Sequence, residues 1–424
     1  MCLEVCGIMM EMFEIEQHFP DDRIEDIEGT VRRLILNHPS LSSLSPKGEI
    51  AVAVGSRGIA NIVEIVRSAV SALRAMGFAP FLVPAMGSHG GGTAEGQIAV
   101  LHHLGITEQS VGAPIRSSME VVHWGHTSRG VPVYFDKNAA SADGLIAINR
   151  IKPHTAFRGS IESGIGKMLA VGLGKMKGAS AIHSRGPLSM AQNIEDVANI
   201  VLGRIPVFVG LAIVENGYDE TESIVTVSKE NWLEQEAELL KKARTLMPAL
   251  PVSQIDVLII EEMGKCYSGT GMDPNVIGRW RIEGVEEPKT PKIKRIVVLD
   301  LAEKSYGNAQ GIGLADFTTQ VLVDKMDRHA TYTNALTSTY IMRAMLPFIF
   351  PTEREAVETA VASLGTDVNA EELKVVQIPN TLHLHRLLIS RSVMRELELS
   401  GKITVIGRKT LSFDRQGKLV NKLT

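Results

Sequence analysis

The chain has 424 residues, more than a single hydrophobic core usually serves, so two or three domains are expected. Hydrophobic residues make up 44% and charged residues 22%, and the net charge is −4 (44 Lys and Arg against 48 Asp and Glu) without a long run of one sign. This charge pattern excludes the basic surface of a nucleic-acid-binding protein, and a small anionic ligand would need a local basic pocket.

From residue 49 onward, short β-rich segments alternate with amphipathic helical segments. The pattern predicts strands at Glu49–Val54, Pro80–Pro84, Val131–Phe135, Gly144–Ile148 and Pro206–Val214. The apolar spacing also predicts helices from residue 61, over 94–104 and around 190–201. Such an alternation favours a mostly parallel sheet with helices on both faces.

A domain boundary is expected after the amphipathic helix Glu230–Met247, at the segment Pro248–Pro251. Residues 1–252 then form an N-terminal α/β domain, and residues 253–424 form a second α/β domain that closes a cleft, although 382–424 could pack back on the first. The predicted elements of the second domain are strands Ile255–Ile260, Ile296–Leu301 and Ile403–Ile406, and helices around Asp316–Asp324, over 353–364 and within 382–410. The fold class expected is therefore α/β, with two domains and mostly parallel sheets.

The compartment is expected to be cytoplasmic. Cys2, Cys6 and Cys266 are too few and too scattered for a disulfide framework or a CxxC metal motif. The apolar start of the chain is short and acidic, so we expect no signal peptide. The sequence has no run of about 18 uncharged apolar residues, so we expect no membrane span. The candidate start residues are Met1, Met9, Met10 and Met12.

Loops at 55–58, 87–93 and 149–167 each follow a predicted strand of the first domain. Ligands of an open parallel sheet bind beyond the carboxyl ends of its strands, so we expect these loops to converge on one site. Ser56 and Arg57 at the start of a helix are typical of anion binding, or of a tight surface turn. His89 lies among four glycines and is a candidate general acid or base, or an incidental histidine on a flexible turn.

The glycine-rich segment Asn149–Gly186 carries His154, Lys167 and His183 and is the most informative part of the chain. A lysine that follows Gly-x-Gly could be a nucleophile or a covalent anchor. The segment is not a Walker A loop, because Ile161 and other residues occupy the required glycine and Ser/Thr positions. His154 at a strand end suits proton transfer, and His183 could be a metal ligand; anion-binding loops with solvated histidines are the alternative.

Two polar, glycine-rich loops of the second domain, 261–279 and 303–316, also follow predicted strands. Lys265, Asn275 and Lys304 in these loops could bind a carboxylate. No HExxH or similar zinc spacing occurs anywhere in the chain.

Taken in chain order, a set of short motifs resembles the catalytic subunit of the nickel-dependent lactate racemase family, over most of the chain and best in the first domain. These motifs are Gly55-Ser56-Arg57-Gly58, Gly87-Ser88-His89-Gly90, Pro153-His154, Gly166-Lys167 and His183. The resemblance implies a nickel pincer nucleotide, a pyridinium-3,5-dithiocarboxylic-type mononucleotide, that is tethered to Lys167. It also implies that His183 binds the nickel while His89 and His154 alternate as acid and base during hydride transfer. The residues expected at the cofactor are Lys167, Ser56, Arg57, Gly58 and Gly166, and those expected at the substrate are Arg57, Lys304 and Asn275.

Some positions depart from the family's pattern. The lactate enzymes carry an Asp-x-Thr-Arg-Pro-like motif where this chain has residues 55–58, and the loop of His89 lacks the arginine that usually follows the histidine. The interval from His154 to Lys167 is also longer than in the lactate enzymes. The expected activity is therefore racemisation or epimerisation of another 2-hydroxy acid, or of a related sugar or polyol acid.

Two other hypotheses remain open. The chain could be a pyridoxal-phosphate enzyme with Lys167 as the Schiff base and 87–93 as the phosphate cup, or a non-catalytic module that binds or delivers a nucleotide or cofactor. The partners expected are a small hydroxy acid, the cofactor-synthesis enzymes and a second copy of the chain, with no nucleic acid and no membrane.

Overall fold

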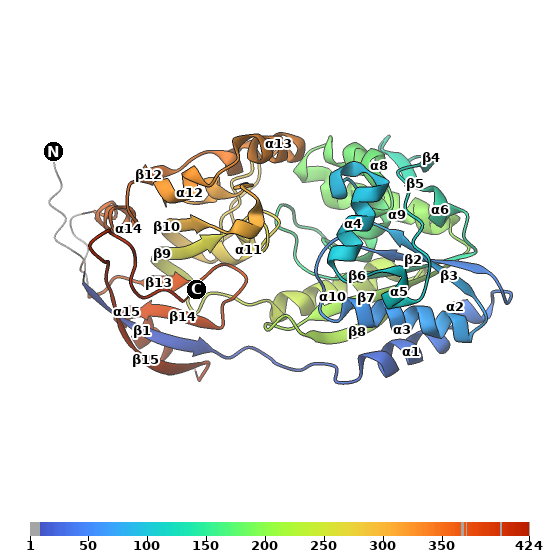
Figure 1. Cartoon of the computed structure of the whole chain (residues 1–424), viewed down its shortest axis with the longest axis horizontal. Coiled ribbons are helices and arrows are strands. Elements are labelled where there is room, and N and C mark those ends of the chain that lie inside the picture. Colours follow the sequence, from blue (N-terminus) through green and yellow to red (C-terminus); the bar gives the residue numbers. More distant parts are fainter. Residues whose placement is uncertain (1–8, 366–368, 370, 399–400, 424) are drawn as a thin grey trace. The chain divides into compact units, whose positions relative to one another are not determined.

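The computed structural model describes residues 9–365, 369, 371–398 and 401–423, which divide into two units (Figure 1). The N-terminal unit is Pro20–Met247, and the C-terminal unit is Pro248–Thr424 together with the start of the chain up to Phe19. The division predicted at residue 252 differs from this one chiefly at the start of the chain, because an N-terminal strand joins the C-terminal sheet. Met1, Cys2 and Cys6 lie outside the described residues.

The sheet of the N-terminal unit has five strands, in the spatial order β3 (Ala79–Pro84), β2 (Glu49–Val54), β6 (Gly144–Arg150), β7 (Val207–Glu215) and β8 (Thr221–Ser228). The first four are parallel, and β8 runs antiparallel to β7 at one edge. The four parallel strands were all predicted, because each is a short apolar run bounded by turn residues.

Alternate residues of these strands face two separate cores, as the two-residue period of a strand requires. On β2, Ile50, Val52 and Val54 pack with helices α1 (Ile27–Leu36) and α3 (Ile62–Ala75). Ala51 and Ala53 face the other core, which includes helices α9 (Met190–Arg204) and α10 (Trp232–Leu246). The sheet therefore has helices on both of its faces.

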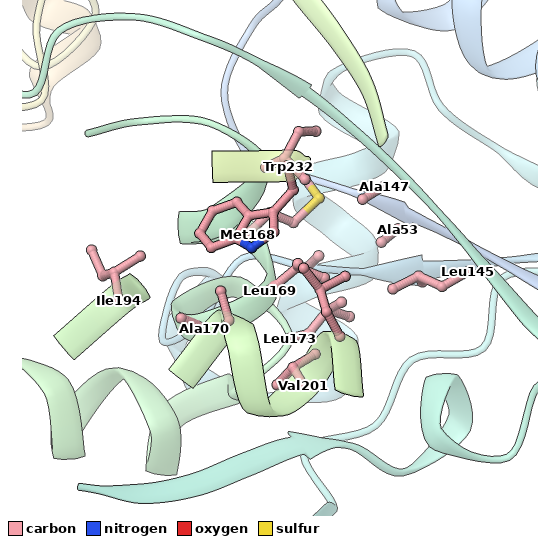
Figure 2. Close-up of a cluster of buried hydrophobic side chains, with 14 of the residues drawn as sticks. Ala53, Leu145, Ala147, Met168, Leu169, Ala170, Leu173, Ile194, Val201 and Trp232 are labelled. Carbon is pink, nitrogen blue, oxygen red and sulfur yellow. The ribbon is translucent and has the colours of Figure 1, made fainter. Parts of the chain in front are cut away.

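An irregular helical segment packs against small side chains on that second face. It consists of α7 (Ile165–Lys167), η2 (Met168–Gly172) and α8 (Lys175–His183). Figure 2 shows Ala53 and Ala147 of the sheet in one cluster with Leu169 and Leu173 of this segment. The segment η2 is a π-helix, a form that often occurs at functional sites.

The remaining elements of the N-terminal unit connect these layers. A separate antiparallel hairpin pairs β4 (Val121–His126) with β5 (Pro132–Asp136), so the strand predicted at Val131–Phe135 exists but lies outside the main sheet. The other helices are α2 (Pro39–Ser42), α4 (Ala94–His103), α5 (Glu108–Val111) and α6 (Lys137–Ala140), with 3₁₀ turns η1 (Gly90–Gly92) and η3 (Pro187–Ser189).

The C-terminal unit is built on an eight-stranded sheet. Its spatial order is β12 (Phe348–Phe350), β11 (Phe317–Thr319), β10 (Lys292–Leu301), β9 (Gln254–Met263), β13 (Val375–Ile378), β14 (Arg386–Ser390), β1 (Met10–Gln17) and β15 (Ile403–Leu411). The first five are parallel, and β14, β1 and β15 are each antiparallel to the strand before them. Its helices are α11 (Pro274–Ile277), α12 (Gln320–Asp324), α13 (Arg328–Ser338), α14 (Glu353–Ala362) and α15 (Arg391–Leu397), and its 3₁₀ turns are η4 (Glu303–Ser305), η5 (Ile312–Leu314) and η6 (Ile341–Ala344).

One expectation for this unit needs correction, and the structure places one segment whose domain the sequence left open. The helix predicted around Asp316–Asp324 begins as strand β11, because Phe317 and the two threonines after it are buried in the sheet, and only α12 is helical. The strands β14 and β15 lie in the C-terminal sheet beside β1, whereas the sequence left open that 382–424 pack back on the first domain.

Both sheets are mostly parallel, and the expected α/β fold class is confirmed. The cleft between the domains stays a prediction. Along the part of the chain that the structure describes, every helix is too short or too polar to cross a bilayer.

Candidate functional site

The three loops expected to bind a ligand leave neighbouring strands of the N-terminal sheet at the same edge. Val54 pairs in register with Pro84 on one side and with Ile148 on the other, so β2, β3 and β6 end side by side. The loops that follow carry Ser56 and Arg57, then His89, then His154 and Lys167. One hydrogen bond joins the first two loops, between Ser56 and His89, and another lies within the third loop, between His154 and Lys167. The charge of Arg57 also acts on Lys167.

His89 contacts the loop of β2 through its ring. Its Nδ1 lies 2.5 Å from the hydroxyl oxygen of Ser56. The ring is exposed, and it precedes three glycines, Gly90 to Gly92, that all have a φ of +66°. A left-handed run of this kind is readily available only to glycine, which explains the glycine-rich sequence after His89.

Lys167 lies at the end of α7, with its amine 2.6 Å from Nε2 of His154. The other ring nitrogen of His154, Nδ1, accepts the backbone N–H of Ala156 at 3.1 Å. A neutral imidazole that accepts at Nδ1 carries its proton on Nε2 and donates there. The amine of Lys167 must then accept, which only its uncharged form can do.

The electrostatic surroundings of Lys167 favour the same uncharged form. Burial and the nearby guanidinium of Arg57 lower the pKa of Lys167 to about 7, although the carboxylate of Glu162 opposes them. Close to half of the lysine is therefore unprotonated at neutral pH, which makes it a nucleophile.

Glu162 also holds the loop of His154 in place. Its buried carboxylate accepts the backbone N–H of His154 at 2.6 Å and forms ion pairs with Arg158 and Arg244, at 3.2 and 2.5 Å. The ring of His154 packs against Phe157, with the ring centroids 4.2 Å apart. The histidine is thus fixed through both its backbone and its ring.

His183 is the last residue of α8 and is half-buried. Burial, and after it the charge of Lys167, lowers the pKa of His183 to about 4. The ring is consequently neutral at physiological pH and keeps one nitrogen lone pair, as a metal ligand requires.

Arg57 is the positively charged residue that the sequence predicted to bind an anion. Burial of the guanidinium among protein atoms, and then the charge of Arg150, lowers the pKa of Arg57, although part of its side chain remains open to solvent. Arg150 is neutralised by an ion pair with Glu215. Arg57 itself forms no hydrogen bond or ion pair with the described part of the chain, so its charge remains available to an anionic ligand.

The two glycines assigned to the cofactor differ in their surroundings. A Cβ atom on Gly58 would meet no atom within 4 Å, so this position leaves open space next to Arg57. A Cβ atom on Gly166 would lie 2.5 Å from the ring of Trp232, so packing against α10 accounts for this glycine. Space for a ligand therefore exists beside Gly58.

Asn275 and Lys304 are not brought to these residues within the N-terminal unit, because both belong to the C-terminal unit. The side-chain amide of Asn275 donates to Asp273 at 2.8 Å, where α11 begins, and Lys304 is exposed in η4. Their role as substrate ligands stays a prediction.

Sequence reasoning missed three buried polar residues next to these loops: Glu236, Gln97 and Lys175. Glu236 on α10 accepts the backbone N–H of Gly166 at 2.8 Å, and burial raises its pKa to about 7. A signal was available, since Glu236 falls at i+4 from Trp232 and i−4 from Leu240, on the apolar side of the helix. Lys175 offered only the positive φ of a non-glycine residue, +53°, which the sequence does not reveal.

Comparison with known proteins places these residues in a family context. Residues 10–192 match the family model described as the lactate racemase N-terminal domain, which confirms the resemblance found in the sequence. No protein of curated function matches the chain. A lactate racemase apoprotein from Thermoanaerobacterium thermosaccharolyticum has a similar structure, with a TM-score of 0.55 and 13% identity, covering 88% of this chain and 98% of that one. A structural-genomics protein from Thermotoga maritima gives a TM-score of 0.50 at 11% identity, covering 87% and 99%. At these identities the solved structures show the fold alone.

Proposed function

We propose that this chain, whose residues 10–192 match the family model described as the lactate racemase N-terminal domain, is a racemase or epimerase of a 2-hydroxy acid or of a related sugar or polyol acid. The observation that carries the proposal is the pair of Lys167 and His154, with the amine and Nε2 2.6 Å apart and the pKa of the lysine lowered to about 7. The changes at residues 55–58 favour a substrate other than lactate.

The residues present fit a nickel pincer nucleotide. An uncharged Lys167 can form the covalent link, and the neutral ring of His183 can bind the metal. Among the described residues, no group of three or more His, Cys, Asp or Glu could hold a metal by itself, and in this proposal the cofactor supplies the other donors. When bound, the cofactor supplies an electrophile that takes a hydride from the substrate carbon and returns it.

The chain's own residues would bind the substrate and move its hydroxyl proton. Arg57, together with Ser56 and the open space at Gly58, offers a site for a phosphate or carboxylate. His154 can exchange a proton at Nε2, and His89 can do so at the nitrogen that does not face Ser56. Two bases on separate loops suit a reaction that converts each configuration of one carbon into the other. Lys304 and Asn275 are proposed to bind the substrate carboxylate.

Production of the protein together with the cofactor-synthesis enzymes tests the proposal. We expect bound nickel, a mass adduct on the peptide of Lys167, and interconversion of one hydroxy acid from a panel without solvent deuterium at Cα. Lys167→Ala should lose the adduct, whereas His89→Gln and His154→Gln should keep nickel and lose turnover by a factor of about 100 or more. His103→Gln, at an exposed helical position, is the control. Absence of nickel, adduct and interconversion from the wild type would overturn the proposal.

A half-buried lysine with a pKa of about 7 also favours a second candidate, a pyridoxal-phosphate enzyme with Lys167 as the Schiff base. Pyridoxal phosphate added to the purified protein would then give a new absorbance band that borohydride abolishes, and the band would be missing in Lys167→Ala. A spectrum unchanged by pyridoxal phosphate rules this candidate out.

The setting of the protein is part of the proposal. The small number of cysteines supports a cytoplasmic location. The partners proposed are the hydroxy acid substrate, the enzymes that synthesise the cofactor, and a second copy of the chain.

A further inference from the structure

Lys175 is a completely buried lysine with three acceptors around its ammonium group. Its Nζ lies 2.5 Å from the carbonyl oxygen of Pro84, 3.0 Å from Oε1 of Gln97 and 3.2 Å from Oδ2 of Asp136. These acceptors come from the end of β3, from α4 and from the end of β5. The contacts with Pro84 and Gln97 are hydrogen bonds, and the contact with Asp136 is a buried ion pair, so the ammonium group is held on three sides.

Gln97 extends this set of contacts to the loop of His89. Its side chain is also fully buried, and its amide nitrogen donates to the carbonyl oxygens of Gly87, at 2.9 Å, and of His89, at 3.4 Å. The ammonium of Lys175 fixes which end of the amide faces it, because only the oxygen can accept. The nitrogen must therefore point to the loop.

Lys175 is at the same time the first residue of α8, the helix that ends at His183. Its φ of +53° is unfavourable for a residue with a side chain, and the buried contacts hold it there. A backbone hydrogen bond also joins the two segments, from Gly87 N–H to the carbonyl oxygen of Gly172 just before α8.

We propose that Lys175 is a positioning residue that fixes the loop of His89 relative to the helix of His183, through Gln97 on one side and Asp136 on the other. The inference rests on the proposed function, which makes His89 an acid or base and His183 a metal ligand. Lys175 itself is neither an anchor nor a base in this proposal, because it is completely buried and its amine is engaged with Pro84, Gln97 and Asp136. A turnover that uses both histidines needs their separation to be held closely.

Two variants test the contacts of Gln97 with the His89 loop separately from those of Lys175 with Asp136. Gln97→Met removes the donors to the His89 loop at similar volume and leaves Lys175 paired with Asp136 and Pro84. Lys175→Met combined with Asp136→Asn removes the central group without leaving a buried carboxylate unpaired. Lys177→Met is the matched control, because Lys177 is an exposed lysine on the same helix.

Amide hydrogen exchange of the full-length protein without cofactor is the first measurement. In Gln97→Met we expect exchange in 86–92 to be faster by about tenfold, with 175–184 unchanged. The double variant should accelerate both segments, and Lys177→Met should accelerate neither. Unchanged exchange in 86–92 of Gln97→Met would overturn the inference, even if the double variant fails to fold.

Kinetics of the loaded protein distinguish positioning from simple stabilisation. Gln97→Met should keep its nickel and its KM and lose kcat by roughly 10- to 100-fold. Unaltered kcat despite faster exchange would show a structural role only and would also overturn the inference. Failure of the proposed function has a different signature, since the wild type would then have no nickel and no turnover while the exchange pattern could still be as expected.

Discussion

At Lys167, two independent features act against the ammonium form. Burial and the charge of Arg57 lower the pKa of the amine to about 7, and the hydrogen bond that Ala156 donates to His154 leaves the opposite ring nitrogen as a donor toward the amine. One feature concerns solvation and charge, and the other concerns hydrogen-bond direction. Their agreement makes Lys167 a candidate for covalent chemistry whatever group it binds.

Selective acylation should reveal this lysine. At pH 7.5 a lysine with a pKa of about 7 is about three-quarters uncharged, against about one part in a thousand for an ordinary lysine. We expect a limiting amount of acetic anhydride to modify Lys167 well before the exposed Lys177, with half-maximal reactivity near pH 7. Peptide mass mapping from pH 5 to 9 measures this. Reactivity of Lys167 that rises only above pH 9 would contradict the assignment.

Arg57 should shift that profile. Because the guanidinium lowers the pKa of Lys167, its removal in Arg57→Gln should move the midpoint of acylation to higher pH and reduce labelling at pH 7. Arg57→Lys keeps the charge and should leave the midpoint close to that of the wild type. If the two variants behave alike, charge is not the cause.

Among the helices, α10 packs against the backbone next to Lys167. Glu236 accepts the N–H of Gly166, and Trp232 packs on the same glycine, so one face of α10 holds the backbone that carries Lys167. Burial raises the pKa of Glu236 to about 7, whereas an unfolded glutamate titrates near 4.5. The folded protein therefore binds more protons than the unfolded chain between these values, and stability falls as pH rises from about 4.5 to 7.

Glu236→Gln should remove this dependence. Glutamine keeps an acceptor for Gly166 and carries no charge, so at pH 8 the variant should be more stable than the wild type, by at most about 3 kcal/mol. At pH 4.5 the difference should fall toward zero. Urea unfolding followed by tryptophan fluorescence measures both values, and because Lys167 titrates in both proteins, its contribution cancels. A variant less stable than the wild type at pH 8 would show that the carboxylate is ionised and stabilising.

The parallel strands of the N-terminal unit were predictable because their burial is decided locally: each is a continuous apolar run. Strand β8 was missed because it is an edge strand of mixed polarity, with Glu222 and Ser223 part-exposed between buried residues. The helix expected at 316–324 failed because sheet packing, which the local sequence does not encode, buries Thr318 and Thr319. The candidate site shows the same limit, since Lys175 and Glu236 are surrounded by groups that are distant in the sequence.

At the scale of the whole molecule, residues 9–19 belong to the same unit as residues 248–423, although more than 200 residues separate them in the sequence. Strand β1 lies between β14 and β15, pairing with the first at 12–16 and with the second along its length, and the chain then crosses to the N-terminal unit. Without residues 10–17 the C-terminal sheet would therefore lack the strand between β14 and β15. Met12 and Ile15 are fully buried there, which makes β1 part of the core of the unit.

Ile15→Ala should therefore destabilise the C-terminal unit, although the substitution lies more than 200 residues before that unit resumes at Pro248. The loss of a fully buried side chain predicts a cost of about 2–5 kcal/mol, and hydrogen exchange in 386–390 and 403–411 should be faster. Acylation of Lys167 should keep its pH profile, because its surroundings belong to the other unit. Glu16→Ala, at the exposed neighbouring position, should change neither quantity. Exchange accelerated around Lys167 but not in β14 and β15 would contradict the division into units, since the effect of Ile15 must appear first in the sheet that buries it.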